Sequence, residues 1–106
     1  MNAQTKRRMK ILLADDGSQH AQAAVRLLLE LPLPLKCRVH VLRVFQPGQI
    51  DALRQMEQSL KQTEERLHKG NINADIDLVL GYPAEKIVET AKEMKPDITV
   101  MGAKGL

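Results

Sequence analysis

Two adjacent carboxylates, Asp15 and Asp16, come directly after an apolar run and just before Gly17 and Ser18. Carboxylates at the end of a buried strand are suited to two kinds of chemistry. A pair of them can hold Mg²⁺ for the transfer of a phosphoryl group to a further aspartate. A single one can accept hydrogen bonds from the hydroxyl groups of a ribose in a nucleotide-binding α/β domain. The elements that surround the two residues decide between these chemistries.

Strands and helices are predicted to alternate along the whole chain. Apolar or alternating runs between turn residues predict strands at residues 9–15, 37–45, 74–80 and 97–101. Apolar residues at helical spacing predict a helix after the N-cap Ser18, one over residues 50–69, and one that starts at Pro83 and ends before Pro96. The expected buried face of this third helix consists of Ile87, Val88, Ala91 and Met94. The alternation predicts an α/β fold of three layers, with helices on both faces of a parallel sheet.

Phosphoryl transfer would require an acceptor aspartate after the third predicted strand. That place holds Leu80, Gly81 and Tyr82. Asp75 and Asp77 lie at the other end of the strand, and alternation places them on its solvent face. Without the acceptor, the paired acids cannot support phosphoryl transfer with a bound metal, so we expect no metal site here.

A nucleotide is the better match to the ends of the strands. The loop GAKG, residues 102–105, follows the fourth predicted strand directly, and its two glycines let backbone amides approach an anion. If the first and fourth strands are neighbours, this loop faces the turn DDGS, residues 15–18, across the crevice where open parallel sheets bind ligands. Asp16 could then bind a ribose, and the first helix would favour negative charge at its N-terminus. Taken singly, these features are also explained by turn chemistry and helix capping.

Composition limits the class of protein. The chain has 106 residues, of which 43% are hydrophobic, and this suits one domain with a small aliphatic core. Its single cysteine, Cys37, rules out an intramolecular disulfide and a cysteine-rich metal site. The formal net charge is +3, and we interpret residues 1–8 as a flexible basic tail before a domain at 9–106. Neither a bilayer-spanning run nor a basic face with stacking aromatics is evident, so we expect a cytoplasmic protein that binds neither membrane nor nucleic acid.

The motifs together resemble the universal stress protein (UspA-like) family. The segments that carry the resemblance are ILLADDGS, RVHVLRVFQP and GYPAEKIVETAKEMKPDITVMGAKG, and they cover nearly everything from residue 9 to residue 106. The combination G-x-P-A-E-x-I…A…D-x-x-V-M-G-x-x-G is much more specific than any of its parts. The resemblance implies a Rossmann-like domain with strand order 3-2-1-4, a homodimer, and in many members an adenine-nucleotide site.

The same resemblance assigns roles to residues. The motif of the ATP-binding members places the site at Ala14, Asp16, Val44, Met101, Gly102 and Gly105. Asp16 would meet the ribose, and the backbone of Val44 would meet the adenine. Ala14 and Met101 would line the pocket, and the two glycines would lie near the ribose and the phosphates. The implied function is that of a stress-associated module that binds ATP or another adenine nucleotide.

The sequence departs from the family at its C-terminal end. The ATP-binding motif continues to a further glycine followed by Ser or Thr, and the family's domain adds a last helix and a fifth strand. This chain stops at Leu106. We therefore expect a truncated domain that lacks the fifth strand, and we expect this domain to discriminate poorly between ATP and AMP. Residues 97–101 would form an unprotected edge, which favours a homodimer or other self-association.

A catalytic role finds little support in the residues. Ser18 has no visible base, and helix capping explains it, so we expect no catalytic residue and no enzyme, although weak ATP hydrolysis stays open. The alternative to nucleotide binding is a universal stress protein that acts only by dimerisation or protein interaction.

Overall fold

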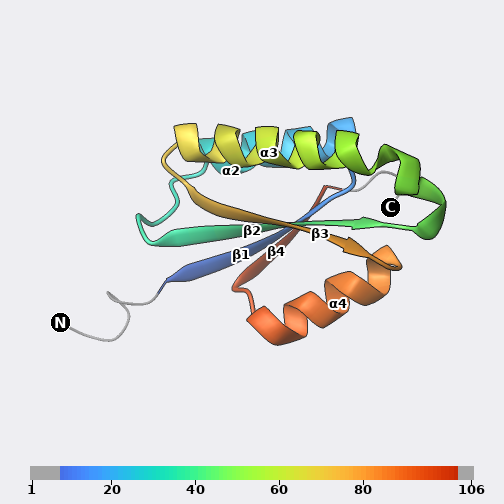
Figure 1. The fold of residues 1–106 in the computed structure, drawn as a ribbon. Coiled ribbons are helices and arrows are strands. Elements are labelled where there is room, and N and C mark those ends of the chain that lie inside the picture. Colours follow the sequence, from blue (N-terminus) through green and yellow to red (C-terminus); the bar gives the residue numbers. More distant parts are fainter. Residues whose placement is uncertain (1–7, 103–106) are drawn as a thin grey trace.

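A computed structural model describes residues 8–102 as a four-stranded sheet with helices on both sides (Figure 1). In chain order the elements are β1 (Met9–Asp15), α2 (Gln19–Glu30), β2 (Cys37–Phe45), the 3₁₀ helix η1 (Pro47–Ala52), α3 (Leu53–Lys69), β3 (Asn73–Leu80), α4 (Pro83–Met94) and β4 (Ile98–Gly102). The predicted basic tail, except Arg8, and the predicted site residue Gly105 lie outside the described residues. The alternation of strands and helices is as predicted.

The strands are all parallel, and their order across the sheet is β3-β2-β1-β4. This order confirms the prediction and places β1 in the interior of the sheet, paired along both sides. In the resulting register Ala14 lies opposite Leu42 on β2 and Met101 on β4, and Asp15 lies opposite Gly102. The end of β1 therefore sits between the ends of its two neighbours.

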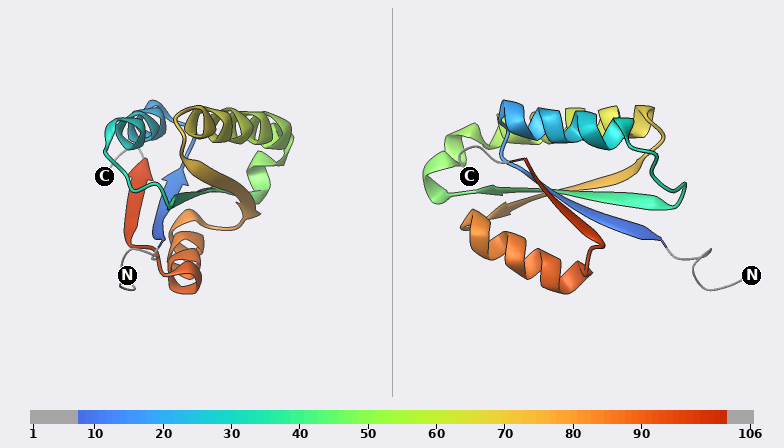
Figure 2. Two further views of the ribbon diagram at one scale, coloured as in Figure 1. Left: turned by 90° about the vertical axis from the view of Figure 1, so that its left-hand side faces the viewer. Right: turned by 180° about the vertical axis from the view of Figure 1, so that it is seen from behind.

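The fold has three layers. Figure 2 shows α2 and α3 side by side over one face of the sheet and α4 over the other. In the described part of the chain, two helices thus cover the first face and one helix covers the second. The predicted three-layer α/β architecture is confirmed.

The main hydrophobic core lies between the sheet and the pair α2 and α3. Alternation along β1 directs Ile11 and Leu13 to this face, where both are fully buried. Both helices pack apolar residues at helical spacing against this face, as the sequence pattern predicts. The buried helix residues are Ala21, Ala24, Val25 and Leu28 of α2 and Met56, Leu60, Thr63 and Leu67 of α3.

The α4 face is packed more loosely than the sequence pattern predicts. Leu12 and Leu42 of the sheet are buried there, yet every residue of α4 keeps part of its surface exposed. Ile87, which the pattern places on the buried face, is half-buried, and Val88 from the same set is 52% exposed. The prediction was wrong for Val88, because one helix crossing this face contacts the sheet with a narrower stripe than its sequence suggests.

Several segment boundaries differ from those predicted, among them the start of β3 at Asn73 rather than Ala74 and the end of β4 at Gly102 rather than Met101. Residues 47–52 form a 3₁₀ helix rather than the first turn of a helix over 50–69, since Pro47 and a reciprocal hydrogen-bonded cap between Gln46 and Gln49 favour the tighter turn. The fourth strand begins at Ile98 rather than Asp97. The backbone N–H of Asp97 donates to the carbonyl of Lys10 over 2.8 Å, and the N–H of Lys10 donates to the Asp97 carboxylate, also over 2.8 Å.

Asp75 and Asp77 of β3 lie on the α4 face rather than on a free solvent face. Their side chains are 48% and 49% exposed and flank His40 of β2, whose Nδ1 lies 2.5 Å from Oδ1 of Asp75. Nε2 of His40 is 3.8 Å from Oδ2 of Asp77. The prediction of a solvent face was wrong in part, because α4 covers the sheet only as far as β2 and leaves these carboxylates between His40 and water.

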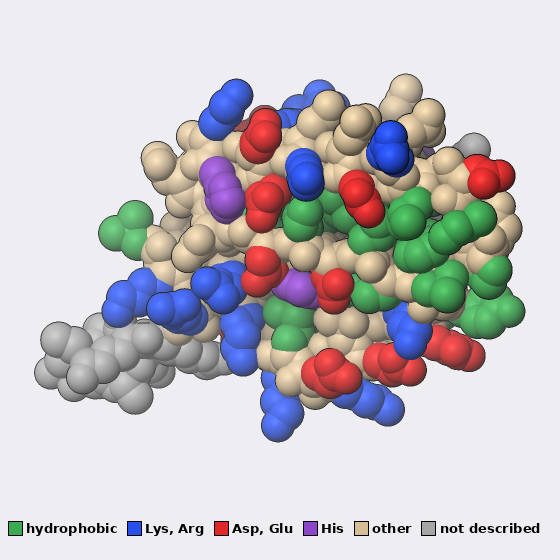
Figure 3. All heavy atoms as spheres, viewed as in Figure 1, with side chains coloured by type: hydrophobic (Ala, Val, Ile, Leu, Met, Phe, Trp, Pro, Cys, Tyr) green, Lys and Arg blue, Asp and Glu red, His purple; other side chains and the backbone are tan. Residues whose placement is uncertain are grey.

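Charges of both signs are mixed over the face of the molecule drawn in Figure 3. Hydrophobic side chains gather at the end of this face where η1 and the carboxyl end of β3 lie. Ile50 and Leu80, at these positions, are both more than half exposed. This apolar end of the molecule is the end at which the strands finish.

Candidate functional site

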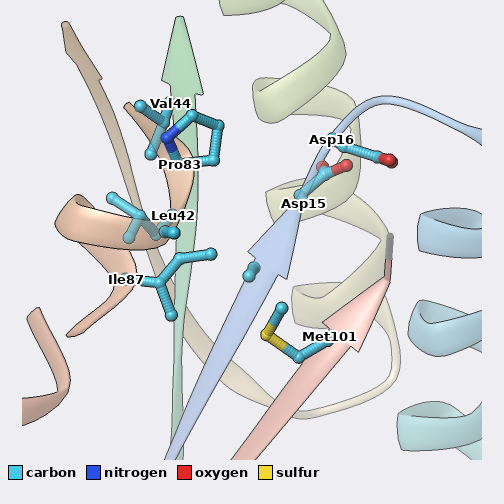
Figure 4. A pocket seen from close by; sticks show the side chains of 9 residues that line it. Asp15, Asp16, Leu42, Val44, Pro83, Ile87 and Met101 are labelled. Atoms are coloured by element: carbon cyan, nitrogen blue, oxygen red, sulfur yellow. The ribbon is translucent and has the colours of Figure 1, made fainter. Parts of the chain in front are cut away.

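A cavity of about 240 Å³ opens at the carboxyl ends of β1, β2 and β4, on the α4 face of the sheet (Figure 4). Its lining residues are Ala14, Asp15, Asp16, Leu42, Val44, Pro83, Ala84, Ile87 and Met101. Pockets for small ligands usually measure roughly 300–1,000 Å³. This cavity is therefore large enough for one ring system but not for a whole nucleoside triphosphate.

The walls of the cavity are apolar because of strand alternation and register. Ala14, Leu42 and Met101 occupy matching positions on three adjacent strands, so their side chains leave the sheet on the same face. Pro83 and Ile87 of α4 close the opposite side. Figure 4 shows Pro83 beside Val44 and Ile87 beside Leu42, with Met101 across the end of β1. A slot of this kind suits a flat, weakly polar ring.

The turn after β1 is held by its own carboxylates. The backbone N–H of Gly17 donates to Oδ1 of Asp15 over 2.7 Å, and the N–H of Ser18 donates to Oδ1 of Asp16 over 2.9 Å. Ser18 caps α2, because its Oγ accepts from the N–H of Ala21 over 3.4 Å. The same hydroxyl donates to the carbonyl of Gly102 over 3.5 Å. The DDGS turn is thus tied to the end of β4, as expected for neighbouring strands.

Asp15 is a lining residue that sequence reasoning did not select. Its side chain is only 4% exposed, and among the described residues its buried Oδ2 has no hydrogen-bond partner. A buried acceptor left unpaired costs about 1–3 kcal/mol, so such atoms are rare in native proteins. The only sequence signal for Asp15 is that it adjoins a second acid, Asp16. The family motif assigns a role to Asp16 alone.

The structure brings together four of the six residues predicted for the site. Ala14, Asp16, Val44 and Met101 all line the cavity. Asp16 is exposed at its mouth, and Figure 4 shows its carboxylate directed away from Leu42 and Ile87.

Gly102 is buried at the end of β4 but is not part of the lining. A Cβ atom there would come within 3.0 Å of the Cβ of Ala21 and closer still to its Cα. The close approach of β4 to α2 therefore already requires this glycine. Gly105 lies outside the described residues.

A second cavity, of about 360 Å³, lies under the other end of α4 and is lined by polar residues. They include Lys10, Arg38, His40, Asp75 and Asp77, with Thr90 and Glu93 from α4. Over residues 8–102, no group of three or more His, Cys, Asp or Glu side chains is placed to hold a metal ion. The same residues contain no helix long and apolar enough to cross a membrane.

The chain matches a family of known proteins over nearly its whole length. The model of the universal stress protein family matches residues 7–106. A curated relative from Thermus aquaticus, described as a universal stress protein, is 35% identical over 107 residues, which cover 91% of this chain and 77% of the relative.

Solved structures with this fold include members of the same family. A universal stress protein family member from Burkholderia pseudomallei is 28% identical, with a TM-score of 0.74, over 89% of this chain and 80% of that one. A family protein from Arabidopsis thaliana, solved with AMP bound, is 20% identical with a TM-score of 0.73, over 92% of this chain and 77% of that one. The second likeness, at this identity, concerns the fold.

Proposed function

This chain belongs to the universal stress protein family, and we propose that it is a cytoplasmic, stress-associated module that binds an adenine nucleotide, ATP or AMP, without turning it over. The observation that carries the proposal is the apolar cavity at the strand ends with the DDGS turn at its mouth. Open parallel sheets bind their ligands at this place. The Arabidopsis thaliana family protein with the same fold was solved with AMP bound.

Adenine is the part of the nucleotide that suits the cavity. The ring would lie between Met101 on one side and Leu42 and Ile87 on the other, where a polar sugar or phosphate would lose its hydration. The backbone of Val44, at the end of β2, would read the edge of the base. Asp16, at the mouth of the cavity, would accept hydrogen bonds from the ribose hydroxyls.

The size of the cavity predicts which part of the ligand supplies the affinity. A volume of about 240 Å³ accommodates the base, and the phosphates remain at the rim. Adenosine, AMP and ATP should therefore bind with dissociation constants within about tenfold of one another, a spread of about 1.4 kcal/mol. We propose no catalytic role for Ser18, because its hydroxyl caps α2 and donates to the carbonyl of Gly102.

Calorimetric titration with AMP, with guanosine monophosphate as the control ligand, tests the proposal. Asp16→Asn should weaken AMP binding by about tenfold, because the amide loses a charge-assisted acceptor. Asp51→Asn, at an exposed aspartate of η1, is the matched control and should bind as the parent does. Equal binding of both ligands, or an unchanged affinity in Asp16→Asn, would contradict the assignment.

The free side of β4 favours a second role, self-association. In residues 8–102, β4 pairs with β1 alone, and Ile98 and Met101 on this strand are 41% and 44% exposed. Unpaired strand edges recruit other strands unless charge, proline or a bulge prevents it. We propose a homodimer that forms through this edge, in which the nucleotide module and the contact surface share β4.

A further inference from the structure

Arg43 of β2 packs its guanidinium against the backbone of Gly17 in the DDGS turn. A Cβ atom built on Gly17 would lie 2.6 Å from Cζ and 2.6 Å from Nη1 of Arg43, and closer still to Nη2. Such similar distances to three atoms mean that the flat face of the guanidinium, rather than one edge, covers the glycine. The φ angle of Gly17 is +78°. The backbone conformation therefore favours glycine here, and any larger residue would also displace the end of the Arg43 side chain.

The charge of Arg43 is not used elsewhere in the described structure. The side chain is half-buried, and over residues 8–102 it has neither a hydrogen bond nor an ion pair with another residue. Guanidinium groups carry five N–H donors and are rarely left without protein acceptors when partly buried. Asp15 and Asp16 directly precede the glycine that Arg43 covers, so two carboxylates lie within two residues of the contact.

Arg43 contacts the DDGS turn, and its neighbour in the chain, Val44, lines the cavity. Successive side chains of a strand point to opposite faces, so Val44 lines the cavity while Arg43 reaches over the end of the sheet to the turn. In the turn, the N–H of Gly17 is bonded to Asp15 and the N–H of Ser18 to Asp16. A displacement of Gly17 would therefore move both carboxylates relative to the cavity.

We infer that Arg43 is a positioning residue of the nucleotide site. Stacked on Gly17, it fixes the turn that carries Asp16, and its positive charge offsets the two carboxylates that would otherwise repel the phosphate of a bound nucleotide. The effect of Arg43 on ligand binding rests on the proposed function, whereas its effect on the turn does not. This role of Arg43 depends on the flat guanidinium as well as on the charge.

AMP titrations of four proteins test the effect on binding: the parent, Arg43→Met, Gly17→Ala and the double variant. Arg43→Met should weaken AMP binding by about tenfold, the scale of one charge-assisted contact. Gly17→Ala displaces the guanidinium, so adding Arg43→Met to it should change the affinity by less than about twofold. Arg43→Lys keeps the charge without the plane and should give an intermediate affinity. Arg54→Met, at an exposed arginine of α3, is the matched control.

Amide NMR spectra of the ligand-free proteins test the effect on the turn separately. Arg43→Met should shift the amide resonances of Gly17 and Ser18, and Arg54→Met should leave them in place. If the parent protein binds no AMP but Arg43→Met shifts these amides, the proposed function is wrong and the positioning role of Arg43 is supported. Parental AMP affinity together with unshifted amides in Arg43→Met would overturn the inference, and Arg43→Lys serves as the test variant should Arg43→Met fail to fold.

Discussion

The two faces of the sheet differ in how completely their helices cover them. On the α2 and α3 face, the helices bury whole stripes of apolar residues against Ile11 and Leu13. On the α4 face, the single described helix leaves a cavity near each of its ends and keeps all its residues partly exposed. The candidate site lies on the second face. The comparison indicates that the first face supplies most of the stability, and that incomplete packing on the second leaves room for a ligand.

The largest expected effect tests the difference in packing between the two faces of the sheet. Leu60→Ala in α3, at a side chain that is 1% exposed, should lower the free energy of unfolding by about 2–5 kcal/mol, because it leaves a cavity in the closed core. Ile87→Ala in α4 removes a half-buried side chain that borders a cavity already present, and should cost about 1 kcal/mol. Urea unfolding of both variants provides the measurement. Equal losses of stability would show that α4 is as firmly packed as α3.

A smaller effect is expected at β4, the edge strand, on its α4 side. Thr99 of β4 lies on the α4 side of the strand and is exposed, whereas Val100 packs against the core of the other face. Thr99→Lys should therefore leave the fold intact but raise the dissociation constant of a β4-mediated dimer by about tenfold or more, because lysine on an edge strand opposes strand pairing. Sedimentation across a concentration series would measure this constant.

The opposite edge of the sheet is the control for this experiment. β3 already carries Asp75 and Asp77, whose half-exposed charges protect it. A lysine at exposed Asn73 of β3 should leave self-association unchanged. A protein that stays monomeric at high concentration, with or without Thr99→Lys, would show that β4 is not a contact surface.

The smallest effect concerns Cys37, at the start of β2, which is buried in the core between the sheet and the pair α2 and α3. Burial raises the pKa of the Cys37 thiol above its ordinary value near 9.0, and the negative charge of Asp97 raises it further. Because the folded pKa is the higher one, the contribution of this group to stability is complete below pH 9 and falls as the pH rises through the folded pKa. Unfolding free energies measured from pH 8 upward should therefore fall more steeply for the parent than for Cys37→Ala. Identical slopes would mean that the thiol is as accessible to solvent as in the unfolded chain.

Several features of the site could be predicted because they follow from short-range patterns. The apolar run of β1 and the turn residues after it predict a buried strand that ends at a ligand crevice, whatever lies around it. Parallel pairing then brings the ends of neighbouring strands together, so Ala14, Val44 and Met101 line one cavity as the family motif implies. The strand order needed the family resemblance, since alternation alone is compatible with more than one order.

What the amino-acid sequence determined by itself is the order of strands and α-helices and which residues of a strand share a face, because these depend on periodicity and local turn chemistry. The tertiary structure alone decided how far each face is covered. Asp15 is buried because α2 and the end of β4 close around the turn, and Arg43 covers Gly17 because β2 lies beside β1 in the sheet. These contacts join residues far apart in the chain, and their distances depend on how helices settle on a twisted sheet, which periodicity does not encode.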